Sequence, residues 1–426
     1  MVTPNDHPYA VDGEIGRFTF QTHRGVDKAG HSWSTATQVF AALGPREWYR
    51  TDGLRELLLQ TATHMAYRPA VALLNRIRHE APDTGTPVRT AAEVVEREGR
   101  TLQTTMNQWA TDVLTSAGFT PQGQPDAASV PTEAHTAIRL LPQTTIDQAA
   151  MRYNQDKAEA FRIDEAAVAA CYEDPAHTVN VSIDDVGVKK QKAAGRRPAT
   201  PPKAGREYVH NTIAHVESPR GRFLLNGLGT EAVLRLLIAF LLHHQMLSDY
   251  SVQFFVDGAR TLHAAILHRL AGWLPLRILL DWYHLEEKCQ GELSLALRGA
   301  KTRHALLEEL LPLLWVGRVD AAIAYLQAIP DHKLKPGQSV DKLIGYFERN
   351  RAYIPCYALR KALHLRNSSN RGEKANDLCV ASRQKHQGMS GSPSGSVALA
   401  TVTTWHHNRG LTTWCTDRNL TLEWVA

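Results

Sequence analysis

The sequence predicts an α/β fold in which a mixed β-sheet is flanked by helices. Three observations predict it. In the string HTVNVSIDD, Val179, Val181 and Ile183 occupy alternate positions, which is typical of a β-strand. Two short apolar runs, VQFFVD and LRILLD, are typical of buried strands and end in Asp257 and Asp281. Long segments with apolar residues at helical spacing separate and follow these strands.

The order of the predicted elements narrows the fold. A second strand, REYVHNTIAHVES, follows the first, and residues Arg222 to Leu225 are predicted to form a third. Helices are expected over Thr230 to Leu247 and over Ala259 to Leu270, each followed by an apolar strand. Three strands followed by helix, strand, helix and strand is the arrangement of an RNase H-like fold. Chemistry in α/β sheets is usually placed at the carboxyl ends of the strands.

The remaining sequence divides around this sheet. Residues 173–290 are assigned to the first part of the sheet domain. Residues 291–365 are predicted to be a helical insertion, because several helical patterns joined by short turns follow the last strand. Residues 366–426 hold a C-terminal segment and the last helix of the sheet domain, which is expected to begin near Asn370 with Glu373 in its first turn.

An all-helical DNA-binding region is predicted ahead of the sheet. Residues 1–50 mix turn formers with polar residues, and a short helix is predicted over Ser34 to Leu43. Residues 51–117 carry helical patterns separated by Gly or Pro turns, which are compatible with a helix-turn-helix DNA reader. A small helical bundle or an oligomerisation module is the alternative, since the helices carry no base-reading signature. Residues 118–172 are predicted to be a linker followed by a polar helix over Thr145 to Tyr172.

Composition bounds the class of protein. The chain has 426 residues, 43% of them hydrophobic and 21% charged, so more than one domain with a buried core is expected. Its five cysteines are odd in number and lack zinc-site spacing, which argues against a disulfide framework and for a reducing compartment. We find no secretory signal and no apolar stretch long enough to cross a bilayer. The sequence therefore predicts a soluble, cytoplasmic protein without a membrane partner.

The distribution of charge points to a polyanionic partner. The formal net charge is +5 at pH 7, which is a mild excess. One stretch that also contains Gly195, Gly205 and several prolines is predicted to be a basic loop. Its basic residues are Lys189, Lys190, Lys192, Arg196, Arg197, Lys203 and Arg206. They are predicted to contact DNA phosphates, and a solvated surface loop is the alternative.

Four acidic residues stand at the ends of predicted strands: Asp184, Asp185, Asp257 and Asp281. A carboxylate that ends an apolar strand is costly to bury unless it is paired or binds a cation. One such residue alone is often a turn or helix cap, and Asp257 before Gly258 is a typical turn pair. Because several occur together, the sequence predicts a site for a hard cation with oxygen ligands, Mg²⁺ or Mn²⁺.

Four strings along the chain carry a family resemblance: SIDDVGVKKQK, FFVDGAR, LLDWYHLEEKC and NRGEKANDLCVASRQKHQGMS. In this order they resemble the bacterial insertion-sequence transposases of the ISKra and ISLre type, which are related to the mutator-like group and belong to the RNase H-like DDE superfamily. The resemblance covers roughly residues 50–412. It implies a catalytic triad of Asp184, Asp257 and Glu373 that holds two divalent metal ions. The family pattern Asp-Gly-x-x-Val corresponds here to Asp184-Asp185-x-x-Val188, which favours Asp184 as the first acid but leaves Asp185 open.

The same resemblance implies supporting residues. Asp281 and His284 match the D-x-x-H signature that the mutator-like and hAT-like groups carry after the second acid, although His284 alternatively begins a helix and caps it locally. The run from Arg383 resembles the family's R-Q-K-x-x-G-M, whose basic residues, here Arg383 and Lys385, are implied to contact phosphates. Where the pattern leads us to expect Trp the chain has Gly391, which is expected to weaken packing and to reduce activity.

The resemblance implies a DNA transposase that cuts and joins strands by two-metal-ion phosphoryl transfer. Its implied partners are double-stranded DNA, as terminal repeats and as target, and further copies of the chain assembled on DNA. Two other classes stay open: a catalytically impaired, transposase-derived DNA-binding protein, and a metal-dependent nuclease without strand transfer. Inverted repeats beside the coding region would favour the mobile element.

Overall fold

The computed structural model describes residues 5–34, 49–80, 85–126, 139–191, 207–387 and 391–426. The chain forms two compact units, each assembled from segments that are distant in sequence. The first unit comprises Met1–Met106, Val186–Asn211 and Leu378–Glu423. The second unit comprises Asn107–Asp185, Thr212–Asp377 and Trp424–Ala426.

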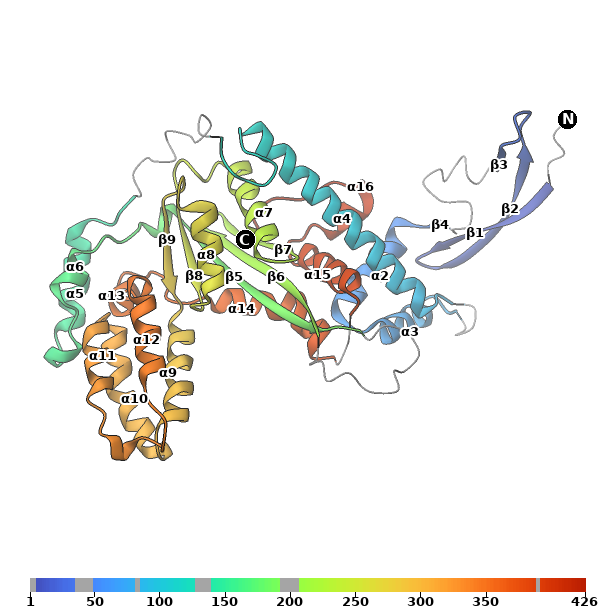
Figure 1. Ribbon diagram of the computed structural model, residues 1–426. Coiled ribbons are helices and arrows are strands. Elements are labelled where there is room, and N and C mark those ends of the chain that lie inside the picture. The colour runs from blue at the N-terminus through green and yellow to red at the C-terminus, as the bar shows by residue number, and fades with distance from the viewer. Residues whose placement is uncertain (1–4, 35–48, 81–84, 127–138, 192–206, 388–390) are drawn as a thin grey trace. The chain divides into compact units, whose positions relative to one another are not determined.

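A five-stranded mixed sheet gives the chain its α/β fold (Figure 1). The strands, in the order β7-β6-β5-β8-β9, are β5 (Thr178–Lys189), β6 (Tyr208–Ser218), β7 (Gly221–Gly227), β8 (Ser251–Val256) and β9 (Leu276–Leu280). β8 pairs in parallel with β5 and β9, and β6 pairs antiparallel with β7. β5 and β6 adjoin where the Lys190 N–H donates to the Glu207 carbonyl, so they too run in opposite directions. Each strand predicted in this region is present.

The register of the parallel strands brings three predicted acids to one end of the sheet. The last paired residues are Ser182 with Phe255 and Val256 with Leu280. Asp257 and Asp281 directly follow their strands, and Asp184 lies two residues beyond the last β5 pair. β8 is buried at every position, because it lies between two neighbouring strands, which explains its continuous apolar run.

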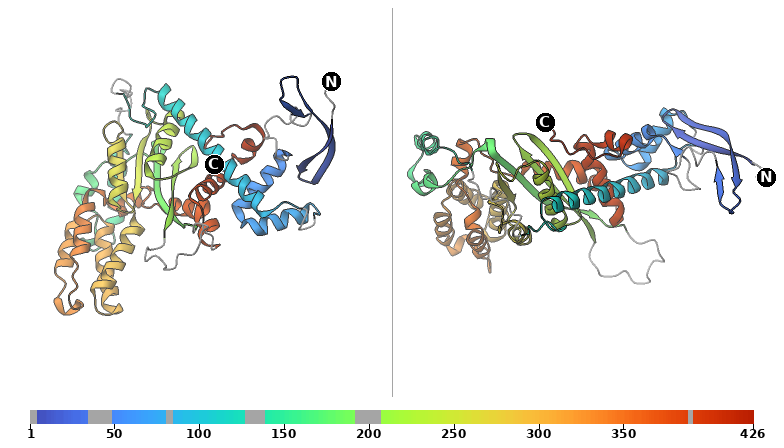
Figure 2. Two further views of the ribbon diagram at one scale, coloured as in Figure 1. Left: turned by 45° about the vertical axis from the view of Figure 1, so that its right-hand side comes forward. Right: turned by 90° about the horizontal axis from the view of Figure 1, so that it is seen from above.

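Two helices connect strands that run in the same direction. α7 (Thr230–His243) leads from β7 to β8, and α8 (Arg260–Leu270) leads from β8 to β9. Such connections are right-handed, and both advance the same way across the sheet, so α7 and α8 cover one face. The two helices contact each other, in agreement with this arrangement (Figure 2). Neither they nor any other helix in the described parts of the chain is long and apolar enough to span a membrane.

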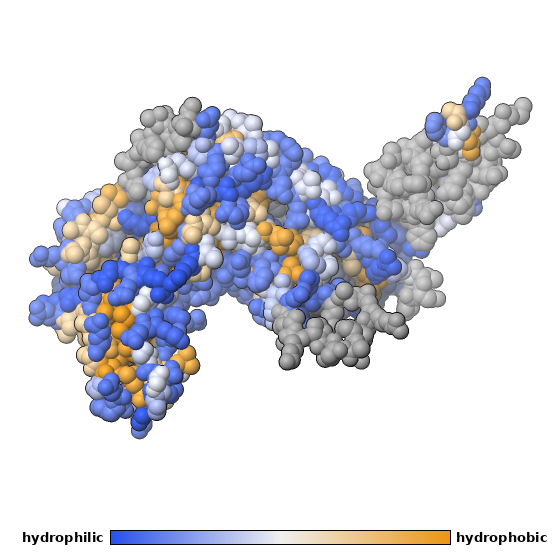
Figure 3. Space-filling view, viewed as in Figure 1, coloured by the Kyte–Doolittle hydropathy of each residue, from blue (hydrophilic) through white to orange (hydrophobic). Residues whose placement is uncertain are grey.

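A bundle of helices follows β9, as the sequence predicts. Its members are α9 (Trp282–Ala296), α10 (Ala300–Trp315), α11 (Val319–Gln327), α12 (Asp341–Asn350) and α13 (Tyr357–Ala362), with short 3-10 turns at Asp331–Lys333 and Arg351–Tyr353. The bundle has its own core, in which Leu310, Leu314, Leu343 and Phe347 are fully buried. Apolar side chains also gather on part of its surface (Figure 3), and Leu295 of α9 is 62% exposed. The insertion is therefore a substructure with a hydrophobic centre of its own.

The helix predicted over Thr145 to Tyr172 is broken in the structure. The segment contains α5 (Gln143–Asn154), a 3-10 turn (Glu159–Phe161) and α6 (Glu165–Ala169). The side chain of Asn154 explains the break, because it donates to the Ile163 carbonyl (2.9 Å) and accepts from the Ile163 N–H (2.8 Å). An Asn side chain that satisfies the backbone in this way competes with a continuous helix. Of the predicted linker, residues 127–138 lie outside the described residues.

Strands that the sequence did not predict lie within residues 1–50, ahead of the region 51–117, which is helical as predicted. Strands β1 (Asn5–Gly13), β2 (Gly16–Val26), β3 (Ser32–Ser34) and β4 (Tyr49–Arg50) form a sheet in the order β3-β2-β1-β4. β2 carries Phe18 and Phe20 at alternate positions, but Pro8 and the glycines at the strand ends are poor strand formers and obscured the pattern. Residues 35–48, which include most of the helix predicted over Ser34 to Leu43, lie outside the described residues.

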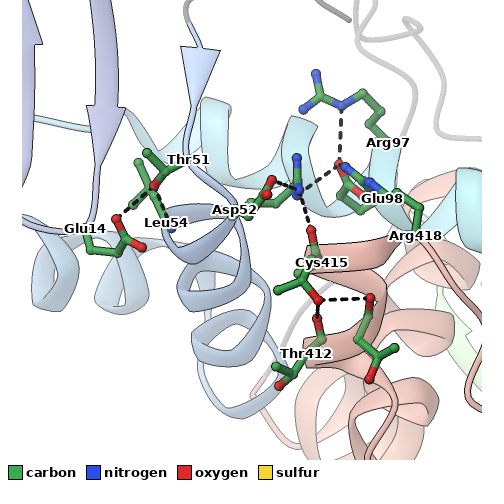
Figure 4. A network of polar contacts seen from close by, with 12 residues as sticks. Glu14, Thr51, Asp52, Leu54, Arg97, Glu98, Thr412, Cys415 and Arg418 are labelled. Carbon is green, nitrogen blue, oxygen red and sulfur yellow. Dashed lines mark hydrogen bonds and ion pairs between the residues drawn. The ribbon is translucent and has the colours of Figure 1, made fainter. Parts of the chain in front are cut away.

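Helices complete the first unit. They are α2 (Asp52–His64), α3 (Tyr67–Ile77), α4 (Val88–Ser116), which continues into the second unit, and, near the C-terminus, α15 (Pro393–His407) and α16 (Leu411–Asp417). Glu98 of α4 is 3% exposed, and cations surround it (Figure 4). It pairs with Arg418 and lies 4.0 Å from Nε of Arg55 and 3.8 Å from Nε of Arg97. This shared buried acid connects α2, α4 and the end of α16.

Candidate active site

Asp184 and Asp185 point to opposite faces of the sheet, because side chains alternate along a strand. Asp185 accepts a hydrogen bond from the hydroxyl group of Thr212 in β6. Asp184 instead lines a hollow at the end of the sheet. The hollow is also lined by Ser182, Asp257, His284, Ser369, Gly372 and Glu373. The structure therefore places Asp184, and not Asp185, beside the other predicted acids.

Glu373 reaches the hollow from α14 (Asn370–Asn376), a short helix that follows the insertion. α14 lies close against β5 because residue 372 is glycine: a Cβ at Gly372 would lie 2.5 Å from the Cβ of Ser182. The carboxylate of Glu373 is 3.3 Å from Nε2 of His284, near the start of α9. Two residues that the sequence analysis singled out separately are thus in contact.

Asp281 connects the starts of two helices to the end of the sheet. Its side chain is fully buried. One carboxylate oxygen accepts the His284 N–H (3.0 Å) and caps α9, and the other accepts the N–H of Ser369, just before α14. The N–H of Asp281 donates to the Val256 carbonyl at the end of β8 (2.9 Å). Asp281 thereby positions the two helices that carry His284 and Glu373.

Replacing Asp281 with Asn is expected to destabilise the protein by about 1–3 kcal/mol, because the amide still caps α9 but turns its NH₂ group toward the Ser369 N–H. Asp164→Asn is the matched control: Asp164 caps α6 through the Ala167 N–H (2.8 Å), and Asn caps a helix equally well. Urea unfolding of both variants measures the difference. Equal losses of stability would contradict the double role of Asp281.

The helical insertion also contributes to the hollow's surroundings. The hydroxyl group of Tyr346 in α12 donates to the carbonyl oxygen of Asp257 (3.1 Å). The next residue, Gly258, has φ of 87°, which is favourable only for glycine, and a Cβ there would lie 2.6 Å from the Tyr346 hydroxyl oxygen. The turn after β8 is therefore held directly against the insertion.

Loss of hydration and the proximity of other acids raise the pKa values of two acids in the hollow. Loss of hydration raises the pKa of Asp184; the hydrogen bond from the Asp185 N–H opposes this shift, and the charge of Asp257 adds to it. Loss of hydration also raises the pKa of Glu373, against the effect of His284, and the neighbouring carboxylates raise it further. The hollow concentrates negative charge that a cation would relieve.

The hollow offers the carboxylate oxygens of Asp184, Asp257 and Glu373. Mg²⁺ and Mn²⁺ prefer such oxygen ligands. As the side chains stand, no group of three or more His, Cys, Asp or Glu residues within the described ranges is arranged to hold a metal ion. Asp184 accepts the Asp185 N–H (2.7 Å), and Glu373 lies against His284. Binding of an ion therefore requires side-chain rotation, above all of Glu373 away from His284.

The residues predicted to contact phosphates have different outcomes. Five of them lie outside the described residues: Lys192, Arg196, Arg197, Lys203 and Arg206. Lys189 and Lys385 are exposed, as phosphate contact requires. Lys190 pairs with Glu207 (2.6 Å) at the mouth of the β5–β6 connection, so a phosphate would have to replace that carboxylate.

Arg383 is buried, which corrects the prediction that it contacts DNA phosphates. Only 1% of its surface is exposed; its Nε donates to the Ala62 carbonyl (2.7 Å), and its guanidinium group lies 5.0 Å from the centre of the Tyr67 ring. Arg383 belongs to a π-helix, Asp377–Lys385, whose wider turn changes which side chains face inward. Its contacts therefore stabilise the first unit.

Gly391 is closely packed, contrary to the expected loss of packing. Its N–H donates to the Lys189 carbonyl (3.0 Å), and its carbonyl accepts from the Gln191 N–H (2.9 Å). A Cβ at this position would lie 2.9 Å from the Cβ of Ser396, so a Trp would not fit without rearrangement. The structure gives no reason to expect impaired activity from this glycine.

Comparisons of the chain with known protein families, with curated proteins and with solved structures find no match. What the site does is therefore inferred from its own residues. Three residues that shape the site were not predicted from the sequence: Tyr346, Gly372 and Asn376, whose Nδ2 donates to Asp184 (2.6 Å). Only Gly372 left a signal in the sequence, as a glycine within a predicted helix directly before the acid.

Proposed function

We propose that the chain is a DDE-type DNA transposase with an RNase H-like core, of the bacterial ISKra and ISLre type, that cuts and joins DNA strands. The observation that carries the proposal is the meeting of Asp184, Asp257 and Glu373 in one hollow, although they come from three elements far apart in sequence. The order of elements, three strands, helix, strand, helix and strand, supports the RNase H-like part of the proposal.

In this proposal Asp184, Asp257 and Glu373 hold two ions, Mg²⁺ or Mn²⁺. Such ions, when bound, activate the attacking water or 3′-hydroxyl and stabilise the departing oxygen. The other residues of the chain supply positioning. Asp281 fixes the starts of α9 and α14, and Tyr346 fixes the carbonyl of Asp257. His284 gives Glu373 an alternative partner when no ion is present.

Double-stranded DNA is the proposed substrate, both as the terminal repeats of the element and as the target. The exposed Lys189 and Lys385, with the basic residues of the stretch 192–206, would contact the phosphate backbone. Binding through phosphates weakens steeply as the salt concentration rises and carries little sequence information. Because two DNA ends are handled together, the proposed working form is a homo-oligomer on DNA in the bacterial cytoplasm.

The test is a reaction of the full-length protein with labelled duplexes that carry the two ends of the encoding element. We expect cleavage at these ends and joining to a second DNA with Mg²⁺ or Mn²⁺, and neither step with EDTA. Cleavage without joining would favour a metal-dependent nuclease, and binding without cleavage a non-catalytic DNA-binding protein. Cleavage at the same rate in EDTA would contradict the metal-dependent mechanism.

A further inference from the structure

Asn376 lies one helical turn after Glu373 in α14, so the two side chains share one side of the helix. The Asn376 side chain is only 6% exposed. Its Nδ2 donates a hydrogen bond to Oδ2 of Asp184 at 2.6 Å. The other oxygen of Asp184 accepts the Asp185 N–H at 2.7 Å. Each oxygen of the first predicted acid thus has a donor of its own, one from β5 and one from α14.

The other end of the Asn376 amide indicates why this residue is present. Its Oδ1 is buried and accepts no hydrogen bond from the described residues. Leaving a buried polar atom unsatisfied destabilises the folded state, and an apolar side chain of similar shape would avoid that loss. Among the described residues, an apolar replacement would therefore lose the hydrogen bond to Asp184. A charge-assisted hydrogen bond of this kind is strong.

We propose that Asn376 is a positioning residue, which fixes the carboxylate of Asp184 in the hollow so that it can bind a divalent metal ion. The inference rests on the proposed function, because a fixed Asp184 matters only if Asp184 is a ligand. Asn376 acts through Asp184 and does not touch the reacting atoms. Since α14 carries both Glu373 and Asn376, one helix supplies an acid of the site and the group that orients another.

The test replaces Asn376 with Leu, which keeps the branched shape of the side chain and removes both the donor and the unsatisfied acceptor. Thermal stability and DNA binding are expected to remain near those of the wild type. The Mg²⁺ concentration for half-maximal cleavage is expected to rise about 10-fold to 100-fold, the usual effect of losing a group that orients a metal ligand, and excess Mg²⁺ should restore the rate. The rise in melting temperature on addition of Mn²⁺ alone should shrink in parallel.

Asn211→Leu is the matched control. Asn211 is 1% exposed, and its Nδ2 donates a hydrogen bond to Oγ of Ser396 (3.0 Å). Its buried Oδ1, like that of Asn376, accepts no hydrogen bond from the described residues. Asn211 belongs to the first unit, whereas Asn376 belongs to the second. It should leave the metal requirement unchanged. Asn376→Ala provides a second test if the Leu variant folds poorly.

The outcomes separate the two proposals. Suppose that the wild-type protein is active and that Asn376→Leu and Asn376→Ala both fold. If these variants then need no more Mg²⁺ than the wild type, and Mn²⁺ raises their melting temperature as much, the role of Asn376 alone is overturned. Wild-type protein that neither cleaves DNA nor gains stability from Mn²⁺ would overturn the proposed function, and this inference with it.

Discussion

Replacing Asp184 with Asn is expected to reduce metal-dependent strand cleavage at least about a thousandfold, whereas Asp185→Asn should stay within about threefold of the wild type. The two residues are neighbours with the same chemistry. Asp184 faces the hollow with Asp257 and Glu373, and Asp185 is bonded to Thr212 on the other face of the sheet. Asp257→Asn and Glu373→Gln are expected to lose as much activity as Asp184→Asn.

DNA binding and thermal unfolding of the same variants distinguish lost chemistry from lost structure. All of them should bind the DNA ends, because the amides keep the size of the acids they replace. Glu308→Gln is the control for Glu373→Gln, since Glu308 is a helix glutamate beside a histidine, His304 (3.2 Å), in α10. An inactive Asp185→Asn with an active Asp184→Asn would assign the first acid to Asp185.

Gly372→Ala is expected to destabilise the protein by about 1–3 kcal/mol, although Ala is the better helix former. The added Cβ would lie 2.5 Å from the Cβ of Ser182, an atom that cannot move without moving β5. α14 must therefore shift, and Glu373 with it. A displacement of about 1 Å at a reacting site can cost about a hundredfold in rate, so activity should fall more than stability alone explains.

Two further variants make this prediction specific. Gly291→Ala, in the exposed face of α9, introduces a Cβ with no heavy atom within 4 Å and should stabilise the protein by up to about 1 kcal/mol. In the double variant Ser182→Gly with Gly372→Ala the clash is absent, so the two changes should be less harmful together than the sum of the single changes. Simple additivity in urea unfolding would show that the contact with Ser182 does not set the position of α14.

Local patterns predicted the elements that carry the acids. The period of two in β5 and the apolar runs of β8 and β9 are properties of consecutive residues, so the strands and the carboxylates at their ends follow from the sequence. The choice between Asp184 and Asp185 did not follow. Strand alternation separates the two side chains, but only the neighbouring β6 and α14 show which face holds the hollow.

Contacts between distant segments explain what the sequence analysis missed. Tyr346 is an ordinary core residue of a helix until the fold brings it to Asp257, 89 residues away in sequence. Arginine is a residue type that commonly binds phosphate, but the π-helix turns the side chain of Arg383 toward Ala62. The N-terminal strands were not predicted, because their pairing, rather than their residue types, stabilises them.

A measurement of Mn²⁺ binding tests the central claim most directly. Binding is measured as the decrease of the free Mn²⁺ signal in electron paramagnetic resonance. The claim is that Asp184, Asp257 and Glu373 together hold divalent ions. With a short duplex present, and the same duplex without protein as reference, the wild type is expected to bind Mn²⁺. Asp257→Asn should bind fewer ions or bind them much more weakly, and Asp185→Asn should match the wild type. Equal number and affinity of bound ions in the wild type and in Asp257→Asn would contradict the account.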